Sequence, residues 1–513
     1  MRIKRLINTL IHLKFIQIIY RIKRRFISQK KRTFKNVLHK KPDLFVDGLH
    51  NDEEYLLRFK TIDNTVDILN QRVELKYRNR NDISPLIKFN LEYFEYAIVW
   101  AQKGIPFSFF KTKWKEYVDS NVPLHPYVIS LQIPNVVIAL SIYKVDDQDI
   151  FDELYARYKW LIKNQEKHLL ANHYFENLKA IVIGSYLFND SKTFKKYLRK
   201  LQKECDEEIL EDGVHFELSP MYHKLVLEDL ILIRKICNEK WIDEYIAKMM
   251  NASLILEKGF GRTPLFNDSG DNVSKSVFAL KKSCNSELGI EAFDNCSLAD
   301  SGYFKIEKNN LSLLIDAGLI GPKYNPGHAH CDCLSFELFK DCSPLFVNSG
   351  TYAYQGEKRK LFRTTSSHNT FMIKNHEQSD CWSEHRVGKR IRKAKGSLKQ
   401  DCFFGTFLNQ FGEKYERKIS LDSGILTVLD SVKTKSDKAM VESFLHLAPG
   451  YCLKEKKICG FGKEYHIDLI DCCVKEIDSL YSPEFGSIEA NKCLVFSWKK
   501  DNNMHGFKIN LVG

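Results

Sequence analysis

Three residues in one short segment have the types and spacing of an acid–base or metal site. His328, His330 and Asp332 alternate with other residues in the run GHAHCDCLSF. If this run is extended, the three side chains point to one face of a strand, and Cys331 and Cys333 point to the other. Two imidazoles and a carboxylate on one face are unusual for core packing, whereas they suit proton transfer or, with a fourth ligand, a divalent metal. We therefore predict a site on this face and core positions for the two cysteines.

A second candidate group lies in the run NHYFENLKA. His173 and Glu176 are three residues apart, so on a helix they share a face, and Glu176 can orient the imidazole or set its charge. Asn172 is a neutral donor beside them. The alternative is structural, because an asparagine before a helix is usually its N-cap and a His–Glu pair usually lies on the surface.

A tyrosine follows a segment that is rich in turn residues. Glycine and proline punctuate the run GVHFELSPMYHK, which contains Glu217 and Tyr222. A rigid loop of this kind presents Tyr222 at the head of the next helix. A tyrosine transfers a proton when a nearby cation or donor stabilises its phenolate, although packing is the more common role of this residue type.

Two further runs, NSGTYAY and FRTTSSHNT, complete the candidate set. His368 comes just before an apolar strand start, and we predict that it closes a site with His330. Cations surround these runs, and they either contact an anionic ligand or belong to a solvated loop. These cations are Arg359, Lys360, Arg363, Arg386 and Lys389.

The first half of the chain has helical periodicity and the second half has the alternation of strands. The helical segments are residues 86–101, 134–143, 155–163, 172–187, 195–210 and 222–237. From residue 298 aromatic and β-branched residues alternate with polar ones, and a hairpin is predicted at Asn309-Asn310. We predict a multidomain α and β chain, with a helical barrel or stacked helical hairpins in residues 46–285 and two packed antiparallel sheets in residues 286–513.

The excess positive charge of the chain is confined to an N-terminal arm, residues 1–45. Residues 1–41 hold 14 Lys and Arg and no Asp or Glu, whereas the rest of the chain holds 64 basic and 65 acidic side chains. A nucleic-acid-binding fold would spread a basic face over its body, so we predict no nucleic-acid partner. Residues 3–26 place apolar residues at helical spacing between cations, which predicts a basic amphipathic helix. This helix either associates with an anionic membrane surface or packs on the protein's own body.

Two features bear on the compartment. The N-terminal segment is a poor secretory signal, because Lys14 interrupts the apolar stretch and no small-residue cleavage site follows. The 14 cysteines form no recognisable disulfide framework, which favours free thiols in a reducing compartment. We therefore favour a cytoplasmic or membrane-associated protein, with the cell envelope or periplasm as the alternative.

Taken together, these runs resemble the heparinase II/III family of polysaccharide lyases. The matching pieces are NHYFENLKA, ELSPMYHK, GHAHCDCLSFEL, NSGTYAY and FRTTSSHNT, with fainter similarity in residues 88–96 and 125–135. The resemblance implies an N-terminal (α/α) toroid of helical hairpins followed by an antiparallel β-sandwich, with the site in the cleft between them. It implies β-elimination at a uronic acid of an acidic polysaccharide, such as a glycosaminoglycan or an alginate-like polymer.

The resemblance also assigns roles to residues. Asn172, or His173 beside it, would neutralise the uronate carboxylate and thereby acidify the C5 proton. Tyr222 would deliver a proton to the glycosidic oxygen and can also take the C5 proton, and His328 would be the alternative base. We predict substrate contacts for Glu176, Glu217 and Arg363.

A zinc ion in metal-binding relatives links the second histidine of G-H-x-H, an aspartate before S-G-x-Y and the histidine of H-N-T. Carried over, these positions are His330, Asn348 and His368. A neutral amide is a poorer zinc ligand than a carboxylate, so metal binding is in doubt, and we expect any zinc here to be structural. A second departure is Gln132, where relatives often carry arginine, and this neutral residue counts against a strongly sulfated substrate.

Three functions compete on this reading. The first is a lyase linked to capsule or surface-polysaccharide metabolism. The second is a non-catalytic glycan-binding or assembly factor on the same fold, which the departures at Asn348 and Gln132 motivate. The third is a glycoside hydrolase, which normally needs two carboxylates that flank the bond. The available carboxylates are Glu176, Glu217, Asp268 and Asp271.

Overall fold

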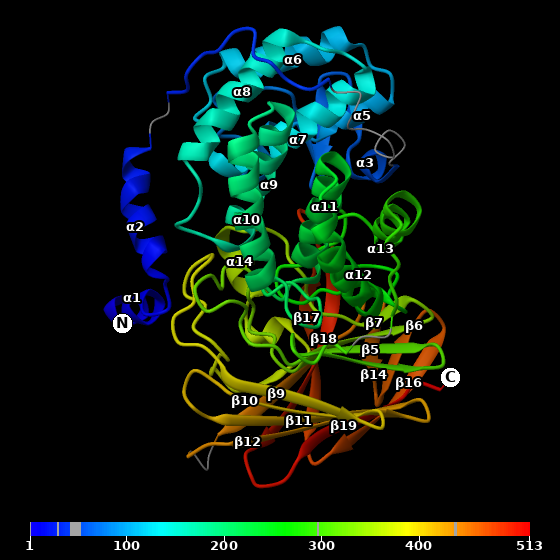
Figure 1. The fold of residues 1–513 in the computed structure, drawn as a ribbon. Coiled ribbons are helices and arrows are strands. Elements are labelled where there is room, and N and C mark those ends of the chain that lie inside the picture. The colour runs from blue at the N-terminus through cyan, green and yellow to red at the C-terminus, as the bar shows by residue number, and fades with distance from the viewer. Residues whose placement is uncertain (1, 28–29, 42–52, 295–296, 436–438, 513) are drawn as a thin grey trace.

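The chain folds into an α-helical part followed by a β part, stacked one on the other in Figure 1. The computed structural model describes residues 2–27, 30–41, 53–294, 297–435 and 439–512. The helices of the helical part are α3 (Glu53–Arg58), α4 (Pro85–Glu92), α5 (Tyr96–Gln102), α6 (Phe107–Asp119), α7 (Pro126–Tyr143), α8 (Gln148–Lys163), α9 (Ala171–Leu187), α10 (Ser191–Glu208), α11 (Pro220–Cys237), α12 (Asp243–Glu257) and α13 (Val277–Lys282).

Local signals explain where these helices begin and end. Asp147, Asp190 and Ser219 cap α8, α10 and α11, because each side chain accepts a hydrogen bond from the backbone N–H three residues on. Every segment that the sequence predicted to be helical contains a helix, although each helix begins earlier than expected. The expectation of a single helical segment at residues 86–101 is wrong, because two helices lie there and are separated at Phe94. The φ of Phe94 is 57°, which is incompatible with a continuous helix.

Helix α9 lies at the centre of the helical part, where it packs against α7, α8, α10 and α11. Large side chains such as Trp100, Phe151 and Phe175 are fully buried in this core. Among the described residues, α7 is the one helix that is long and apolar enough to cross a membrane, yet 78% of its apolar window is buried inside the fold. The apolar character of α7 is therefore explained by its place in the core.

A small sheet that was not expected from the sequence joins the two parts. Strands β1 (Thr61–Ile62), β2 (Thr65–Ile68) and β3 (Gln71–Glu74) pair in that order and antiparallel. The two turn residues between β2 and β3, Leu69 and Asn70, both have positive φ, as a tight hairpin turn requires. Asn70 Nδ2 donates to the backbone oxygen of Phe485 in the β part at 3.0 Å.

In its described residues, the β part consists of three antiparallel sheets that share one apolar core. The eight-stranded sheet has the order β14-β15-β16-β19-β12-β11-β10-β9, and the four-stranded sheets have the orders β17-β18-β13-β8 and β4-β5-β6-β7. The bounds are β4 (Tyr303–Lys308), β5 (Leu311–Asp316), β6 (Ser335–Lys340), β7 (Ser343–Phe346), β8 (Phe371–Ile373), β9 (Arg392–Lys399), β10 (Cys402–Leu408), β11 (Lys414–Asp422), β12 (Ile425–Lys433), β13 (Met440–His446), β14 (Cys452–Lys454), β15 (Lys457–Gly460), β16 (Lys463–Ile470), β17 (Cys473–Tyr481), β18 (Glu489–Lys499) and β19 (His505–Asn510).

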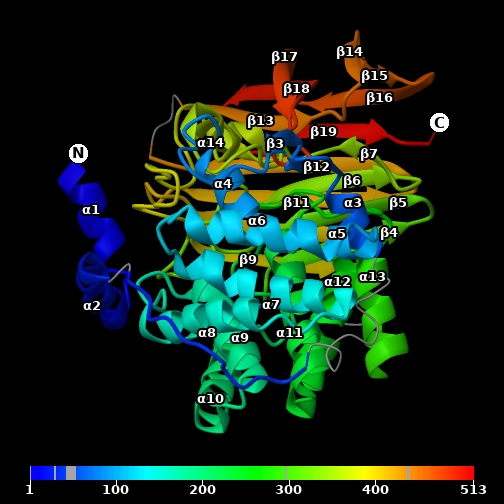
Figure 2. The same cartoon turned by 90° about the horizontal axis from the view of Figure 1, so that it is seen from above.

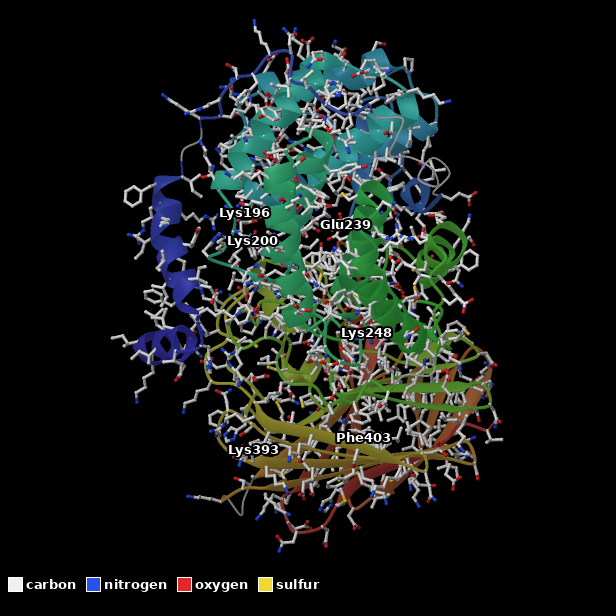
Figure 3. All side chains as sticks on the ribbon, viewed as in Figure 1. Lys196, Lys200, Glu239, Lys248, Lys393 and Phe403 are labelled. Carbon is white, nitrogen blue, oxygen red and sulfur yellow. The ribbon has the colours of Figure 1, made fainter. Side chains whose placement is uncertain are left out.

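Strand alternation accounts for this core. Alternate residues of β11 and β12 are buried, as expected for strands with one wet face. Phe403 of β10 is fully buried in the same core (Figure 3). The hairpin predicted at Asn309-Asn310 is confirmed, because β4 pairs with β5 across these two residues.

The two parts meet where the sheet β4-β5-β6-β7 lies beneath α12 (Figure 1). The rings of Phe260 and Phe339 have centroids 4.3 Å apart at this contact. The hydroxyl of Tyr303 donates to the backbone oxygen of Leu218 at 2.6 Å, just before α11 begins. These contacts fix the head of α11 against the strands of the β part.

The predicted amphipathic helix of the N-terminal arm is two helices, α1 (Arg2–Leu10) and α2 (Phe15–Lys23). Both stand at one side of the molecule, outside the helical part and the β part (Figures 1 and 2). A short helix of the β part, α14 (Gly356–Phe362), lies on the same side.

The cysteines in the described residues are all free thiols. Cys331 and Cys333 are buried, which agrees with the core positions predicted for them. The sulfur atoms of Cys331 and Cys381 lie 3.7 Å apart.

Candidate functional site

A cavity of about 620 Å³ lies between the helical part and loops of the β part, among them residues 325–328 and 352–355. Four side chains that the resemblance implicates in catalysis line this one cavity. They are Asn172, His173, Tyr222 and His328. The structure therefore brings together residues that are up to 156 positions apart in the sequence. Their individual roles stay predictions.

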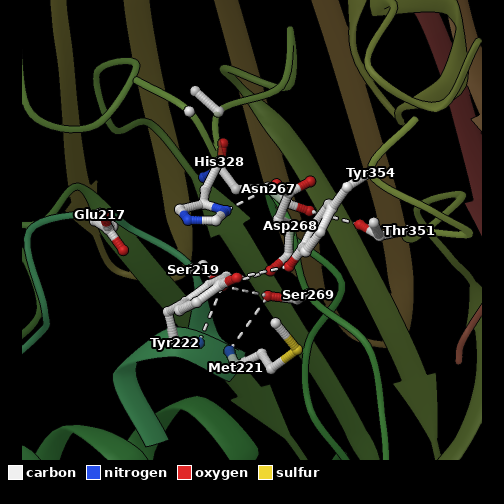
Figure 4. Close-up of polar contacts among 12 residues, drawn as sticks. Glu217, Ser219, Met221, Tyr222, Asn267, Asp268, Ser269, His328, Thr351 and Tyr354 are labelled. Carbon is white, nitrogen blue, oxygen red and sulfur yellow. Dashed lines mark hydrogen bonds and ion pairs between the residues drawn. The ribbon is translucent and has the colours of Figure 1, made fainter. Parts of the chain in front are cut away.

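Tyr222 is held rigidly at the head of α11. Ser219 accepts a hydrogen bond from the backbone N–H of Tyr222 at 3.2 Å, and Pro220 occupies the first helical position. The hydroxyl of Tyr222 lies 2.7 Å from that of Tyr354, and its ring centroid lies 3.9 Å from that of His328 (Figure 4). Burial raises the pKa of Tyr222 well above its ordinary value, so the phenol is protonated at neutral pH.

His328 is oriented by a buried carboxylate. Its Nδ1 lies 2.9 Å from Oδ2 of Asp268 (Figure 4). Because an ionised carboxylate only accepts hydrogen bonds, Nδ1 carries the proton and Nε2 keeps its lone pair. Burial lowers the pKa of His328, and Asp268 offsets part of that shift. The imidazole therefore has one nitrogen that is able to accept a proton.

Asp268 connects the helical part to the loop that carries both histidines. Its Oδ1 lies 2.8 Å from Nε2 of His330, and both of its oxygens accept from Arg359, with Arg359 Nη2 2.9 Å from Oδ2. Its backbone N–H donates to the oxygen of His328 at 2.9 Å, and its backbone oxygen accepts from Ser219 Oγ at 2.7 Å. Burial would raise the pKa of Asp268, but Arg359 and the two imidazoles lower it well below its ordinary value.

The run that carries His328, His330 and Asp332 is not a strand, so that prediction is wrong. Residues 327–328 and 333–334 form turns, the residues between them are irregular, and β6 begins only at Ser335. Side-chain hydrogen bonds, and not the backbone pairing of a strand, hold this run in position. Asp332 Oδ2, for example, accepts a hydrogen bond from the backbone N–H of Asn267 at 2.7 Å. The two imidazoles converge because they share one carboxylate, and not because they alternate along a strand.

Replacing Asp268 by asparagine is expected to lower the free energy of unfolding by about 3–5 kcal/mol, because the buried Arg359 guanidinium loses its counter-charge. Urea unfolding followed by circular dichroism measures the change. Asp478→Asn is the matched control, because Asp478 has a 90% exposed side chain in a surface pair with Lys492 and contributes little. Equal stability of the two variants would contradict the central position given to Asp268.

Asn172 and His173 lie in the first turn of α9. His173 Nδ1 lies 3.4 Å from Oε1 of Glu166, a buried carboxylate in the preceding loop. Asn172 Oδ1 is buried and makes no hydrogen bond of normal geometry within the described residues, and the side chain lines the cavity. Glu176 does not orient His173, because it pairs with Lys179 at 2.6 Å instead.

The predicted substrate-contacting residues are separated by the structure. Glu176 lines the cavity, whereas Glu217 and Arg363 are buried and are not among the described residues that line it. Oε2 of Glu217 lies 3.9 Å from Nδ1 of His215. Arg363 donates from Nε to the backbone oxygen of Ala329 at 2.9 Å, so it shapes the loop between the two histidines. Local sequence gives no sign that these two charged side chains point inward.

His330, Asp332 and His368 form a buried set with the residue types of a metal site. One ligand atom from each lies within 4.8 Å of the others. Nδ1 of His330 and both ring nitrogens of His368 make no hydrogen bond of normal geometry within the described residues. Asn348 is also buried, and its Oδ1 accepts a hydrogen bond from the backbone N–H of Asn369, the neighbour of His368, at 3.2 Å.

Sequence reasoning missed three contributors to the site. Tyr354 lies in the run NSGTYAY, but nothing in that run indicated its contact with Tyr222. Asp268 was considered only as a hydrolase carboxylate, and Glu166 was not considered. Asp268 lies within a turn-rich run, NDSGDN at residues 267–272. This run is the one sequence signal that marks Asp268 as a loop residue.

The acidic side chains that line the cavity are all paired with cations. They are Glu95, Glu176, Glu228 and Asp229. Lys179 pairs with Glu176 and Asp229, and Arg58 pairs with Glu95 and Glu228. A glycoside hydrolase needs a carboxylic acid and a free carboxylate on either side of the bond. The pairing argues against the hydrolase alternative.

Comparison with known families matches two sequence profiles to this chain. The profile described as Heparinase II/III N-terminus matches residues 136–286, and the profile described as Heparinase II/III-like, C-terminal matches residues 293–468. Together these matches cover more than half of the chain. No curated protein matches the chain.

Several solved structures are similar over nearly the whole chain. A crystal structure of heparinase III has a TM-score of 0.65 at 14% identity, covering 96% of this chain and 88% of that one. The heparan sulfate lyase HepC from Pedobacter heparinus has a TM-score of 0.57 at 14% identity, with the same two coverages. A heparinase III that is the BT4657 gene product has a TM-score of 0.63 at 14% identity, covering 93% and 86%. The likeness confirms the predicted fold class, an (α/α) toroid followed by an antiparallel β-sandwich.

Proposed function

The chain belongs to the heparinase II/III family and is a polysaccharide lyase, and from this premise we propose that it cleaves a uronic-acid-containing glycan by β-elimination. The observation that carries the proposal is the convergence of Asn172, Tyr222 and His328 on one cavity. Elimination needs a group that quenches the carboxylate charge, a base and an acid around a single sugar ring. An amide, an imidazole and a phenol are suited to these three tasks.

The two proton transfers are assigned to different residues. Nε2 of His328 takes the C5 proton, because Asp268 holds the other ring nitrogen in its protonated form. The electron pair of the C5–H bond forms the C4–C5 double bond, and the C4–oxygen bond breaks. The leaving oxygen takes its proton from the Tyr222 hydroxyl, which burial keeps protonated. Tyr354 is placed to return a proton to Tyr222, since their hydroxyls lie 2.7 Å apart.

The carboxylate of the sugar is assigned to the first turn of α9. Asn172 presents an amide to the cavity, and His173 lies beside it with Glu166 at its Nδ1. Donors that approach the carboxylate favour the enolate-like transition state more than the ground state, which lowers the barrier to C5 deprotonation. Asn172 is therefore proposed to be the neutralising group, with its Nδ2 as the donor and His173 beside it.

A uronate with little sulfation is the proposed substrate class. The Lys and Arg side chains that line the cavity are each paired with a carboxylate. They are Arg58, Lys179, Lys235 and Lys275. Cations that are already paired offer little net charge to a sulfate group. Gln132 agrees with this, because it is buried and binds Arg157 and a backbone oxygen away from the cavity lining.

Incubation with uronate polymers of graded sulfation tests the proposal. Ultraviolet absorbance reports the unsaturated sugar ends that elimination leaves. We expect absorbance to rise with unsulfated uronate polymers, such as hyaluronan or alginate, and to rise more slowly with heparan sulfate. Glycan binding without any rise would instead support the alternative of a non-catalytic glycan-binding or assembly factor.

A link to capsule or surface-polysaccharide metabolism is the finer part of this proposal. The support for it lies in the N-terminal arm, whose cations and apolar side chains suit a membrane surface near the site of polysaccharide assembly. The free cysteines agree with a reducing compartment. Genetic deletion followed by analysis of the cell's surface glycans tests this link.

We also propose a structural zinc held by His330, His368 and Asp332. The donor set fits, because two imidazoles and one carboxylate are typical zinc ligands and three of the ring nitrogens have no other partner of normal geometry. Asp332 would take the part that an aspartate at position 348 plays in metal-binding relatives. A zinc held here would tie the loop before β6 to the loop before β8, and it supplies no step of the elimination.

Zinc is expected to co-purify with the chain and to stabilise it, by about 2.7 kcal/mol at a free concentration one hundred times the Kd. Metal analysis and thermal melting with and without a chelator measure the two effects. The variant His368→Ala should lose both the bound zinc and the stabilisation by zinc. The variant His376→Ala should keep both, because His376 lies outside this set in a half-exposed pair with Glu413. Zinc content that is unaffected by His368→Ala would contradict the assignment.

A further inference from the structure

Residues 2–27 of the N-terminal arm touch both parts of the protein through polar atoms. Arg5 Nε donates to Asp380 of the β part at 2.9 Å. Gln17 is 1% exposed, and its Nε2 reaches the backbone oxygen of Leu169 in the helical part at 3.1 Å and that of Tyr324 in the β part at 3.3 Å. Gln17 is the one buried side chain among residues 3–27, and it is polar.

Further polar contacts hold the same side of the arm. Thr9 Oγ1 donates to the backbone oxygen of Val387 at 3.3 Å and accepts from Trp382 Nε1 at 3.2 Å. Lys14 pairs with Glu207, and its ammonium lies 4.1 Å from the ring centroid of Tyr324. These contacts fix which side of α1 and α2 faces the body.

The opposite side of the arm presents large apolar side chains to solvent. Phe15 is 76% exposed and Phe26 is 81% exposed. The other exposed apolar side chains of the arm are Ile3, Leu6, Ile7, Leu10, Ile11, Ile16, Ile18 and Ile22. An amphipathic helix that packs on its own protein buries its apolar face. Here most of the large apolar side chains face outward, and only Leu13, Ile19 and Ile27 are half-buried, so packing on the body does not account for the exposed apolar face.

Charge decides what covers this apolar face. Lys4, Lys23 and Arg25 are exposed beside the apolar side chains, and residues 2–27 contain no Asp or Glu. A protein surface that is hydrophobic and cationic over the same helices matches the boundary between acyl chains and anionic headgroups. A second copy of the chain is a poorer match, because two such faces would bring like charges together. We propose that the arm docks on an anionic lipid bilayer.

Docking through the arm would also place the cavity near the bilayer. Leu169, which Gln17 contacts, lines the cavity, and so does Asn325, the neighbour of Tyr324. The arm therefore contacts the helical part and the β part beside residues that line the cavity. This inference concerns the surface of the arm and holds whether or not the proposed elimination is correct.

Vesicle sedimentation with the full chain tests the proposal. We expect binding to phosphatidylcholine vesicles that contain phosphatidylglycerol, weaker binding to phosphatidylcholine alone, and a loss of binding as salt is raised. Ile11→Ser combined with Phe15→Ser should weaken binding about tenfold or more, because both side chains would enter the bilayer. The control is Phe278→Ser combined with Phe461→Ser, two side chains of similar exposure outside the arm.

Three results would overturn the proposal. They are no binding of the unaltered chain to the anionic vesicles, equal binding by the arm variant and the unaltered chain, and a dimer in sedimentation equilibrium that the arm variant dissociates. The last result would assign the apolar face to a second copy. Both double variants should keep the melting temperature of the unaltered chain, since the four replaced side chains are exposed.

Discussion

Tyr222→Phe is expected to lower kcat about 100- to 10,000-fold while leaving glycan binding nearly unchanged. The change removes one oxygen, so the ring still packs against His328, with centroids that are 3.9 Å apart in the unaltered protein. What is lost is the proton for the leaving oxygen and the hydrogen bond to Tyr354. Initial rates from ultraviolet absorbance, together with calorimetric binding of the same glycan, separate the two effects.

The nature of the leaving group sharpens this test. A uronate that carries an aryloxy group at C4 needs little protonation as the bond breaks, so Tyr222→Phe should be far less damaging on that substrate. Tyr155→Phe on α8 is the matched control, because Tyr155 does not line the cavity among the described residues. An equal loss on the natural and the aryloxy substrates would contradict the assignment of Tyr222 as the acid.

His328→Gln is expected to lower kcat by a similar factor, about 100- to 10,000-fold, on both kinds of substrate. Glutamine keeps a polar side chain but has no basic nitrogen to take the C5 proton. The loss should persist with the aryloxy leaving group, because that group leaves the C5–H bond unchanged. The contrast between the two variants therefore distinguishes the base from the acid.

The matched control for His328 is His376→Gln, since His376 is partly exposed in a pair with Glu413 outside the cavity. Activity should stay at the unaltered level in this control. Deprotonation at C5 is also visible directly, because exchange of the C5 hydrogen with heavy water should be lost in His328→Gln. Exchange at an unaltered rate would show that another residue is the base.

Much of the fold is predictable from sequence because its determinants are local. The capping residues Asp147, Asp190 and Ser219 mark helix starts, and the alternation in β11 and β12 marks strands with one buried face. The division into a helical part and a β part follows from the change of periodicity. The broken helix at Phe94 and the small sheet β1-β2-β3 were missed, since short elements carry too few residues to show a period.

The candidate residues were predictable from two different signals. His328 stood out because two imidazoles and a carboxylate in one short run are unusual for core packing, whereas Asn172 and Tyr222 were implicated by the resemblance to the family, and all three line one cavity. The partners that set their geometry were not predictable, because Asp268 pairs with His328 across 60 residues and Arg359 across 91. Glu217 and Arg363 were predicted to contact the substrate, and charged side chains are usually exposed. Both are buried, and neither is among the described residues that line the cavity.

The orientation of the N-terminal arm was likewise beyond the sequence. The apolar period of residues 3–26 predicts an amphipathic helix but not which face meets the body. That choice depends on acceptors supplied by distant segments, such as the backbone oxygens of Leu169 and Tyr324 that bind Gln17. Tertiary contacts therefore set which face of the arm meets the body.

Mass spectrometry of the products formed in heavy-oxygen water tests the central claim most directly. Elimination takes no oxygen from water, so incubation of the unaltered protein with an unsulfated uronate polymer should give unsaturated fragments that carry no heavy oxygen. The variants Tyr222→Phe and His328→Gln should give almost no fragments. Saturated fragments that carry one heavy oxygen, or no fragments from any uronate polymer, would contradict the claim that these residues catalyse β-elimination.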